Sequence, residues 1–347
     1  MPTISIDTFF ACTLILIVVF VSMAATASVA APHIRGFQDL NEEAYLRKIA
    51  EYTVTSPGSP TNWGQIQSSS PDVFGLAKEN SFSYDLDVDK VSRLSNQSIY
   101  ALTYLELLTA LRLEKVALSY SITQIMDITI LMTSNVTVGD STTYNFNVTV
   151  SRDQTPLATN LQCYVVARDF FNSTTSNTAI DGKGIVQTSI PNNSNGPVLL
   201  IVFARNPYDS RLTAQGSYIF AHLSLEPQPN NTFVNLSPLN NTLTITPNIS
   251  DINLESGNVF TYGYESTLLP TSNSSYIVPE FLDSSPQVLA VTGWNGSDFF
   301  IEWATYPQVP LALGADFKFA ETFSFKYLVT IDEVFYQLNV KCGGPSL

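Results

Sequence analysis

The longest apolar stretch of this chain lies close to its amino terminus. Residues 8–34 contain no Asp, Glu, Lys or Arg, and residues 9–23 are almost all apolar. A helix over residues 9–31 rises about 35 Å, which is enough to cross the hydrocarbon core of a bilayer. The pattern therefore predicts a transmembrane helix. Side chains of the predicted span include Phe9, Leu14, Ile17, Phe20 and Met23.

Two interpretations of this segment remain open. The small residues at 25–30 suit cleavage of a secretory signal, whereas residues 1–7 lack the Lys or Arg that such a signal normally carries. We therefore prefer a retained anchor. Pro32 and Gly36 predict a kink or a break after the span. Asp39 and Glu42 have capping-box spacing and predict an amphipathic helix, which should end at residues 56–60.

The following segment combines one helix with short extended pieces. Thr103 and Glu106 form a second capping-box pattern, ahead of a leucine-rich stretch. Residues 74–77 and 120–130 read as extended. We expect a small α+β region over residues 57–126.

Two β-rich regions follow. Apolar and polar residues alternate over 144–150 and 161–165, while 198–203 is continuously apolar and predicts a strand buried on both faces. Alternation returns over 317–331, where Asp332 and Glu333 can turn the chain into a last strand at 335–340.

The predicted fold class is therefore mainly β. We expect a transmembrane helix and amphipathic stem (1–56), the α+β region (57–126), an immunoglobulin-like β-sandwich (127–225) and a second β-sandwich (235–347).

Asparagine sequons indicate the side of the membrane on which the β-rich part lies. With 25 Asn, and 71 Ser plus Thr among 347 residues, chance gives about five N-x-S/T sequons, yet the chain has 11, all after residue 95. We expect a single-pass protein of the cell membrane with its carboxyl-terminal part outside. The candidate glycosylation sites are Asn96, Asn135, Asn147, Asn172, Asn192, Asn230, Asn235, Asn240, Asn248, Asn273 and Asn295.

Composition narrows the possible chemistry. The formal net charge is −14, from 30 acidic and 16 basic residues, which argues against a nucleic-acid partner. Two His and three Cys leave little material for zinc or haem sites. The chain also lacks the common nucleophile, metalloprotease and nucleotide-binding motifs. We expect no cofactor, no metal and no catalytic residue.

An aspartate series at 85–89 resembles the start of a calcium loop. Asp85, Asp87 and Asp89 have the spacing of its first three ligands, but Lys90 replaces the required glycine and Asn96 the bidentate glutamate. The series instead predicts a solvated junction between a strand and a helix.

The cysteines and the strand histidine have competing interpretations. Cys12 lies in the predicted membrane segment and cannot reach the others. Cys163 and Cys342 form either a disulfide or, for Cys163, a buried free thiol. His222, alone in a strand-like run, is more typical of a hydrogen-bonded structural residue than of a catalytic base.

Acids and aromatics gather between residues 280 and 310. An acid pair for glycoside chemistry would come from Glu280, Asp283, Asp298 and Glu302. The simpler interpretation is a strand, 299–304, with one packed face. The loop at 306–314 is either a contact surface or a loop laid over the core. The candidate ligand or partner surface comprises Trp294, Trp303, Tyr306 and Pro310.

The first 130 residues resemble archaeal type IV pilin-like surface proteins. The resemblance rests on residues 5–10 (SIDTFF) with the apolar run after them, the end of the stem at 53–64, residues 74–77 (FGLA) and residues 90–94 (KVSRL). It implies an amino-terminal helix that carries a β-sandwich head outside the cell. The chain lacks the basic residue and glycine that the prepilin peptidase reads before the run, and the glutamate just inside it.

Three hypotheses for function follow. The first is a membrane-anchored extracellular structural or interaction glycoprotein, a pilin-like subunit or adhesin without catalytic activity, whose partners are the bilayer and either like subunits or surface glycans. The second is an anchored or secreted carbohydrate-binding module. The third is a surface glycoside hydrolase that uses an acid pair within residues 280–302.

Overall fold

The computed structural model describes the backbone of residues 6–113, 116–272, 274–317 and 322–343. It describes the side chains of the same residues other than 6–12 and 25–41. The chain divides into two compact units, Met1–Ala50 and Glu51–Leu347.

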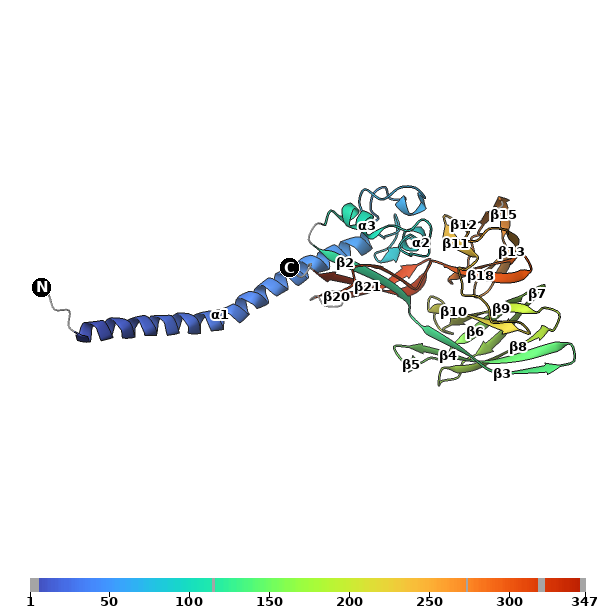
Figure 1. Cartoon of the computed structure of the whole chain (residues 1–347), viewed down its shortest axis with the longest axis horizontal. Helices are drawn as coiled ribbons and strands as arrows, with labels where there is room; N and C mark the ends of the chain where they lie inside the picture. Colours follow the sequence, from blue (N-terminus) through green and yellow to red (C-terminus); the bar gives the residue numbers. More distant parts are fainter. Residues whose placement is uncertain (1–5, 114–115, 273, 318–321, 344–347) are drawn as a thin grey trace. The chain divides into compact units, whose positions relative to one another are not determined.

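One long helix, α1 (Ile6–Thr55), runs through the first unit and ends inside the second (Figure 1). Of the predicted kink or break at 32–36 the break is wrong, as is the separate helix start at Asp39, because the backbone stays helical through both. A proline removes one backbone hydrogen bond, and the turns on either side retain theirs. The predicted end is confirmed, since α1 stops just before Ser56 and Pro57.

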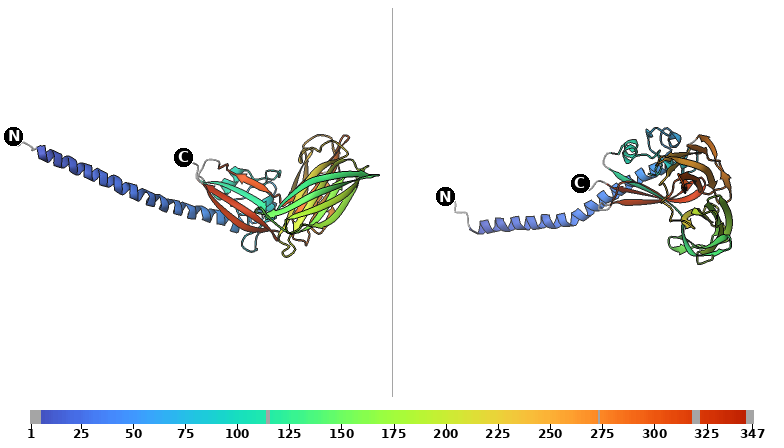
Figure 2. Two further views of the ribbon diagram at one scale, coloured as in Figure 1. Left: turned by 90° about the horizontal axis from the view of Figure 1, so that it is seen from below. Right: turned by 45° about the vertical axis from the view of Figure 1, so that its right-hand side comes forward.

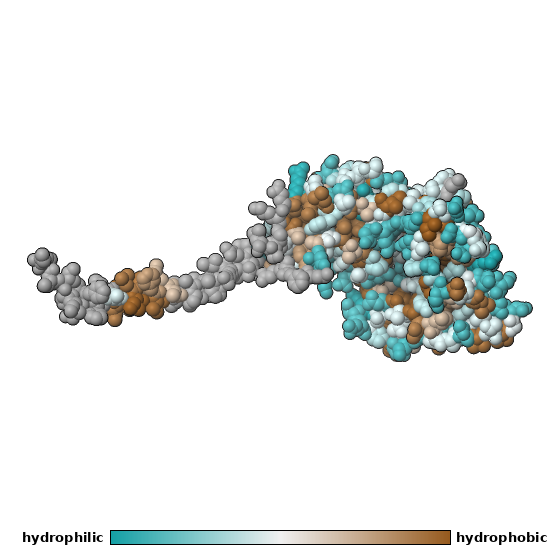
Figure 3. Space-filling model, in the orientation of Figure 1, coloured by the Kyte–Doolittle hydropathy of each residue, from teal (hydrophilic) through white to brown (hydrophobic). Residues whose placement is uncertain are grey.

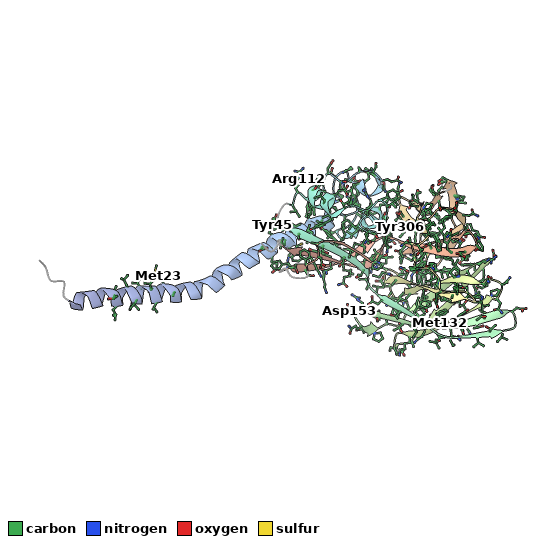
Figure 4. All side chains as sticks on the ribbon, in the orientation of Figure 1. Met23, Tyr45, Arg112, Met132, Asp153 and Tyr306 are labelled. Carbon is green, nitrogen blue, oxygen red and sulfur yellow. The ribbon has the colours of Figure 1, made fainter. Side chains whose placement is uncertain are left out.

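The described side chains of α1 are all exposed over residues 13–24. Nine large ones between residues 14 and 23 are 45–68% exposed, as the brown segment of Figure 3 shows. Met23 projects from the helix in Figure 4. Among the described residues, no helical stretch is both long and apolar enough to cross a membrane. Phe9 lies outside the described side chains.

The second unit is mainly β, as predicted. Three short helical elements accompany the strands: η1 (Trp63–Gln65), α2 (Val88–Ser92) and α3 (Tyr104–Leu111). One sheet, called here the terminal sheet, contains in order β1 (Asp85–Leu86), β20 (Phe323–Ile331), β21 (Val334–Gly343), β2 (Ala117–Gln124) and β19 (Leu311–Gly314).

The terminal sheet joins strands from distant parts of the sequence. The predicted hairpin is confirmed: Asp332 and Glu333 adopt the left-handed conformation, with φ of 46° and 65°, between β20 and β21. The hairpin was expected in the second sandwich, but β21 pairs instead with β2 along Ala117–Gln124. Alternation along a strand identifies its buried face and does not identify its neighbour.

Both short α-helices begin as the sequence predicts. Thr103 and Glu106 form a complete capping box on α3. Asp87 caps α2, because its carboxylate accepts hydrogen bonds from the backbone N–H groups of Asp89 and Lys90, each 3.0 Å long. The aspartate series is therefore a strand-to-helix junction, but the expectation that it is solvated is wrong at Asp89, which is 3% exposed.

Two buried cations of α2 and its end hold the surrounding loops. Lys90 Nζ donates to the carbonyls of Pro57 and Ala77 at 2.9 and 2.7 Å. Arg93 Nη1 donates to the carbonyls of Trp63 and Ile66, both at 2.8 Å. Burial lowers the pKa of both side chains. Carbonyl oxygens here take the place that paired carboxylates usually fill around buried charge.

Residues 127–222 form the first β-sandwich, seen from two directions in Figure 2. Tyr144 and Phe146 of one sheet pack against Phe220 of the other, with ring centroids 4.9 and 5.3 Å apart. The first outer sheet contains β3 (Asp127–Val138), β4 (Ser141–Arg152), β5 (Thr155–Pro156) and β8 (Lys183–Pro191). The first inner sheet contains, in order, β10 (Thr213–His222), β9 (Gly196–Arg205), β6 (Asn160–Ala167) and β7 (Phe170–Asn177).

Residues 234–306 form a second pair of packed sheets. Leu243 and Ile245 of the outer sheet share a core with Leu289 and Phe300 of the inner sheet. The second inner sheet contains, in order, β14 (Glu265–Thr267), β13 (Ile252–Phe260), β17 (Gln287–Asn295) and β18 (Asp298–Tyr306). The second outer sheet contains, in order, β11 (Val234–Leu239), β12 (Thr242–Pro247), β16 (Ser275–Ile277) and β15 (Leu269–Ser272).

The two inner sheets pack on each other. Ile201 and Phe203 on the far face of β9 share a core with Phe260, Val288 and Ile301 of the second inner sheet. The four sheets are therefore stacked, outer, inner, inner, outer (Figure 1). The prediction that residues 198–203 form a strand buried on both faces is confirmed.

The cysteines do not form the suggested disulfide. Cys163 and Cys342 are both free and buried, the first in β6 and the second in β21. Burial raises the pKa of each thiol to about 12. The alternative of a buried free thiol at Cys163 is thus confirmed.

The contact between the inner sheets predicts a large stability effect at Phe203. This ring is fully buried and lies 6.0 Å from that of Tyr164, at a nearly perpendicular angle. Phe203→Ala should lower the free energy of unfolding by roughly 3–5 kcal/mol, because a cavity replaces the ring. Urea unfolding monitored by tryptophan fluorescence measures this change. Ile180→Ala, at a side chain 92% exposed, is the matched control; an equal effect of both variants contradicts the prediction.

Candidate functional site: two pockets beside Trp294

The four residues predicted to form one ligand or partner surface do not lie on one surface. Trp294 is half-buried at the end of β17, and Trp303 is half-buried in β18 against the core between the inner sheets. Tyr306 is buried at 3% exposure, while Pro310 is exposed. Of these four, only Trp294 lines a pocket described below.

Tyr306 has a structural role inside the second unit (Figure 4). Its hydroxyl donates to Asp89 Oδ1 at 2.6 Å, and the backbone N–H of Asn240 donates to the same oxygen at 2.7 Å. Further along the loop, Gln308 Nε2 donates to the carbonyl of Leu236, and Val309 is buried. The loop at 306–314 is therefore laid over the core, the second of the two interpretations.

The four predicted acids do not come together as a pair. Glu280 accepts a hydrogen bond from Asn241 Nδ2, and Asp283 forms an ion pair of 2.8 Å with Arg205. Asp298 and Glu302 line one pocket. Asp298 is exposed, whereas Glu302 is buried with its carboxylate held by backbone N–H groups, so the two do not form a free acid pair.

Glu302 binds the segment that links the two sandwiches. Its side chain is 1% exposed, and its carboxylate accepts hydrogen bonds from the backbone N–H groups of Asn231 and Phe233. Burial raises the pKa of Glu302, while those N–H groups oppose the shift. The expectation that strand 299–304 has only one packed face is wrong, because Phe300 and Ile301 are both buried, on opposite faces.

His222 is a structural residue, as predicted. It is fully buried, with Nδ1 2.8 Å from the hydroxyl of Tyr144 and Nε2 3.0 Å from the carbonyl of Pro191. Among the described residues, no three His, Cys, Asp or Glu side chains are grouped as metal ligands.

Two pockets open at one end of the stacked inner sheets. The Arg168 pocket, about 390 Å³ in volume, is lined by Arg168, Asn195, Trp294 and Asp298 among others. The Phe171 pocket, about 500 Å³, includes Phe171, Glu255, Glu265 and Thr292 in its lining. Phe299 lines both pockets, so they adjoin.

A connected group of side chains separates the pockets. The Arg168 guanidinium lies over the Trp294 ring, 4.8 Å from its centroid. The indole Nε1 of Trp294 donates to Glu255 Oε2 at 3.1 Å. Asp169, next to Arg168 in the chain, lines the other pocket and lies 3.6 Å from Arg168 Nε. One face of Trp294 is therefore covered and does not serve as an open platform.

Local backbone features place these charges. Asp169 adopts the left-handed conformation, with φ of 52°, in the tight turn between β6 and β7. The pairing of β13 with β17 shifts register between Leu254 and Ser256, so Glu255 sits at a β-bulge. Bulges redirect a side chain out of the regular alternation, and they occur often beside functional sites.

The Phe171 pocket is strongly acidic at its rim. Asp169, Glu255 and Glu265 line it and are exposed. Arg168 is the only basic residue among the described residues that line either pocket. The Phe171 pocket therefore disfavours anionic ligands.

The sequence indicated only part of this arrangement. Trp294 and Asp298 were singled out, whereas Arg168, Asp169, Glu255 and Glu265 were not. Arg168 and Asp169 form the turn between β6 and β7, Glu255 lies at the bulge within β13, and Glu265 begins β14, so these residues share no sequence motif. The sequence did contain one signal for part of the site: Arg168-Asp169 is a turn sequence between two strand-like segments.

Comparisons with known proteins do not assign a family. No family model matches the chain, and no curated protein matches it. Among solved structures, HBP35 of Porphyromonas gingivalis is similar at 12% identity and a TM-score of 0.21, over 52% of this chain and 63% of that one. Human GIVD cytosolic phospholipase A2 is similar at 9% identity and a TM-score of 0.16, over 67% and 33%. The chain thus covers less than two thirds of either protein, and neither similarity is close enough to support an argument about fold or function.

The Asp89 junction predicts a pH dependence of stability. Burial raises the pKa of Asp89, and the hydrogen bonds from Tyr306 and Asn240 only partly offset this. The folded state therefore binds the proton at a higher pH than the unfolded state, so the contribution of Asp89 to stability falls as pH rises above 3.8. Asp89→Asn should weaken this pH dependence and leave the protein at least as stable at pH 7, because the amide oxygen accepts the same bonds.

Urea unfolding at pH 5 and pH 7 measures both effects. Asp153→Asn, at an exposed turn residue, is the control and should leave the difference between the two pH values unchanged. An Asp89→Asn variant with the full wild-type pH difference, or one destabilised by several kcal/mol at pH 7, contradicts the prediction.

Proposed function

We propose that this chain is a membrane-anchored extracellular structural and interaction glycoprotein. In this proposal α1 holds the protein in the bilayer, and two immunoglobulin-like sandwiches form a head outside the cell. The observation that carries the proposal is the run of nine large apolar side chains between residues 14 and 23, each at least 45% exposed. An exposed apolar run of this size on a helix calls for cover by lipid or by another protein.

The sequons support an outside location for the head. Asn96, Asn135 and Asn172 are exposed, and the last two lie on β3 and β7, which are edge strands of their sheets. Asn240 and Asn248 are exposed as well, while Asn147, Asn192, Asn235 and Asn295 are partly buried. Asn273 lies outside the described residues.

The resemblance of the first 130 residues to pilin-like proteins adds a partner. It favours association with like subunits through α1, as a pilin-like subunit or an adhesin. Two of the predicted acids, Glu302 and Asp283, already have partners within the protein. This favours a binding role for the head over a hydrolytic one.

Vesicle flotation of the full chain tests the anchor. Ile17→Lys combined with Phe20→Lys should abolish flotation with phosphatidylcholine vesicles, because each Lys at the centre of a span costs about 2.5–3.5 kcal/mol. Ile180→Lys combined with Leu225→Lys is the matched control, since both positions are about nine-tenths exposed, at 92% and 90%. A wild-type chain that stays at the bottom of the gradient, or an Ile17/Phe20 variant that still floats, overturns the anchor.

Peptide mass spectrometry of the protein from its own host tests the outside location. Asn96, Asn135 and Asn172 should carry glycan because they are exposed. Asn230 should not, because its Nδ2 donates to the carbonyl of Trp303 at 2.8 Å and its Oδ1 accepts from the N–H of Trp303 at 3.0 Å. Unmodified asparagine at all three exposed sites, or glycan at Asn230, contradicts the prediction.

A further inference from the structure

We propose that the Phe171 pocket binds a neutral saccharide. The inference rests on the proposed function, since an extracellular head meets glycans, and it names the ligand class of that head. Its basis is a single cavity that combines an open aromatic face, fixed hydroxyl groups and a carboxylate rim.

The volume of the pocket suits a small ligand. Its 500 Å³ lies within the roughly 300–1,000 Å³ of typical small-molecule sites. The cavity opens where the two inner sheets end, so one wall comes from β6 and β7 and the other from β13, β14, β17 and β18. A site between two rigid sheets is largely formed before the ligand arrives, which lowers the cost of binding.

Phe171 supplies an apolar face for a sugar ring. Its side chain is 44% exposed, and its ring stacks on those of Phe260 and Tyr164, with centroids 5.9 and 6.2 Å apart. Those two rings are buried and lie 5.2 Å from each other. The stack holds Phe171 in place with one side toward the pocket. A pyranose presents a face of C–H groups that packs on such a ring.

Hydroxyl groups on the pocket wall are already oriented. Thr292 is 5% exposed, and its Oγ1 lies 2.9 Å from the Oγ of Ser256. Asn258 Nδ2 lies 3.4 Å from the same Ser256 oxygen. These groups hold one another in place and retain further donors and acceptors for a polyhydroxylated ligand.

The carboxylate rim selects for hydroxyl donors. The N–H of Trp294 orients Glu255 at the bulge, and Glu265 lines the same pocket from β14. Hydroxyl groups of a sugar donate to ionised carboxylates in short, charge-assisted hydrogen bonds. The same carboxylates repel sulfate, phosphate and uronate groups, and Asp169 lies close to the one nearby cation, Arg168. Acidic glycans are therefore poor ligands for this pocket.

The test uses the full chain in detergent micelles on an array of neutral, amino, sulfated and uronate-containing oligosaccharides. Calorimetric titration of the best ligand follows. We expect binding to neutral glycans, weakened at least tenfold in Phe171→Ala and in Glu265→Gln. Ile180→Ala, an exposed apolar residue away from the pocket, should bind as the wild type does. Circular dichroism and urea unfolding verify that each variant is folded, and Phe171→Leu replaces Phe171→Ala if the latter is not.

Several outcomes overturn the inference. They are no binding to any glycan, binding that both pocket variants leave unchanged, and a preference for acidic glycans or for amines. Vesicle flotation of the same preparation separates this result from the proposed function. A chain that floats but binds no glycan refutes only the saccharide site, whereas one that binds glycan but does not float refutes only the anchor.

Discussion

The second unit depends on the burial of two sheets on both of their faces. The first inner sheet contacts its outer sheet through residues such as Val202 and the second inner sheet through residues such as Phe203. The second inner sheet does the same with Leu289 and Val288. Strands in this position must be apolar at consecutive positions, because neither face meets water. The two outer sheets need only one apolar face each, and they cover the inner sheets from outside.

The position of the candidate site follows from this constraint. Polar side chains are costly between the inner sheets unless they are hydrogen-bonded, so charges gather where the sheets end. At one such end the turn of β6 and β7 and the bulge of β13 bring Arg168, Asp169 and Glu255 around Trp294. The indole is satisfied by a carboxylate and covered by a guanidinium, so it separates two pockets. The open aromatic face belongs to Phe171.

Buried polar groups also connect the segment around α2 to the second sandwich. Lys90 and Arg93 bind backbone carbonyls of loops, and Asp89 accepts bonds from Tyr306 and Asn240. Each charge is surrounded by donors or acceptors of fixed geometry, so removal of a partner lowers the stability of the folded state. This network explains why an apolar-looking loop at 306–314 lies over the core and presents little surface for a partner.

The sequence alone determined the features that depend on neighbours in the chain. Periodicity predicted the mainly β character, the strand at 198–203 and the β20–β21 hairpin. Capping chemistry predicted the start of α3, and the strand-to-helix junction at Asp87 followed from the failed calcium-loop pattern. Only the tertiary structure decided which elements meet. It paired β21 with β2, separated Cys163 from Cys342, buried Tyr306, and brought Arg168 and Glu255 to Trp294. The physical reason is that alternation and capping record which side of a segment is buried, whereas the partner of that side is set by packing between residues far apart in the chain.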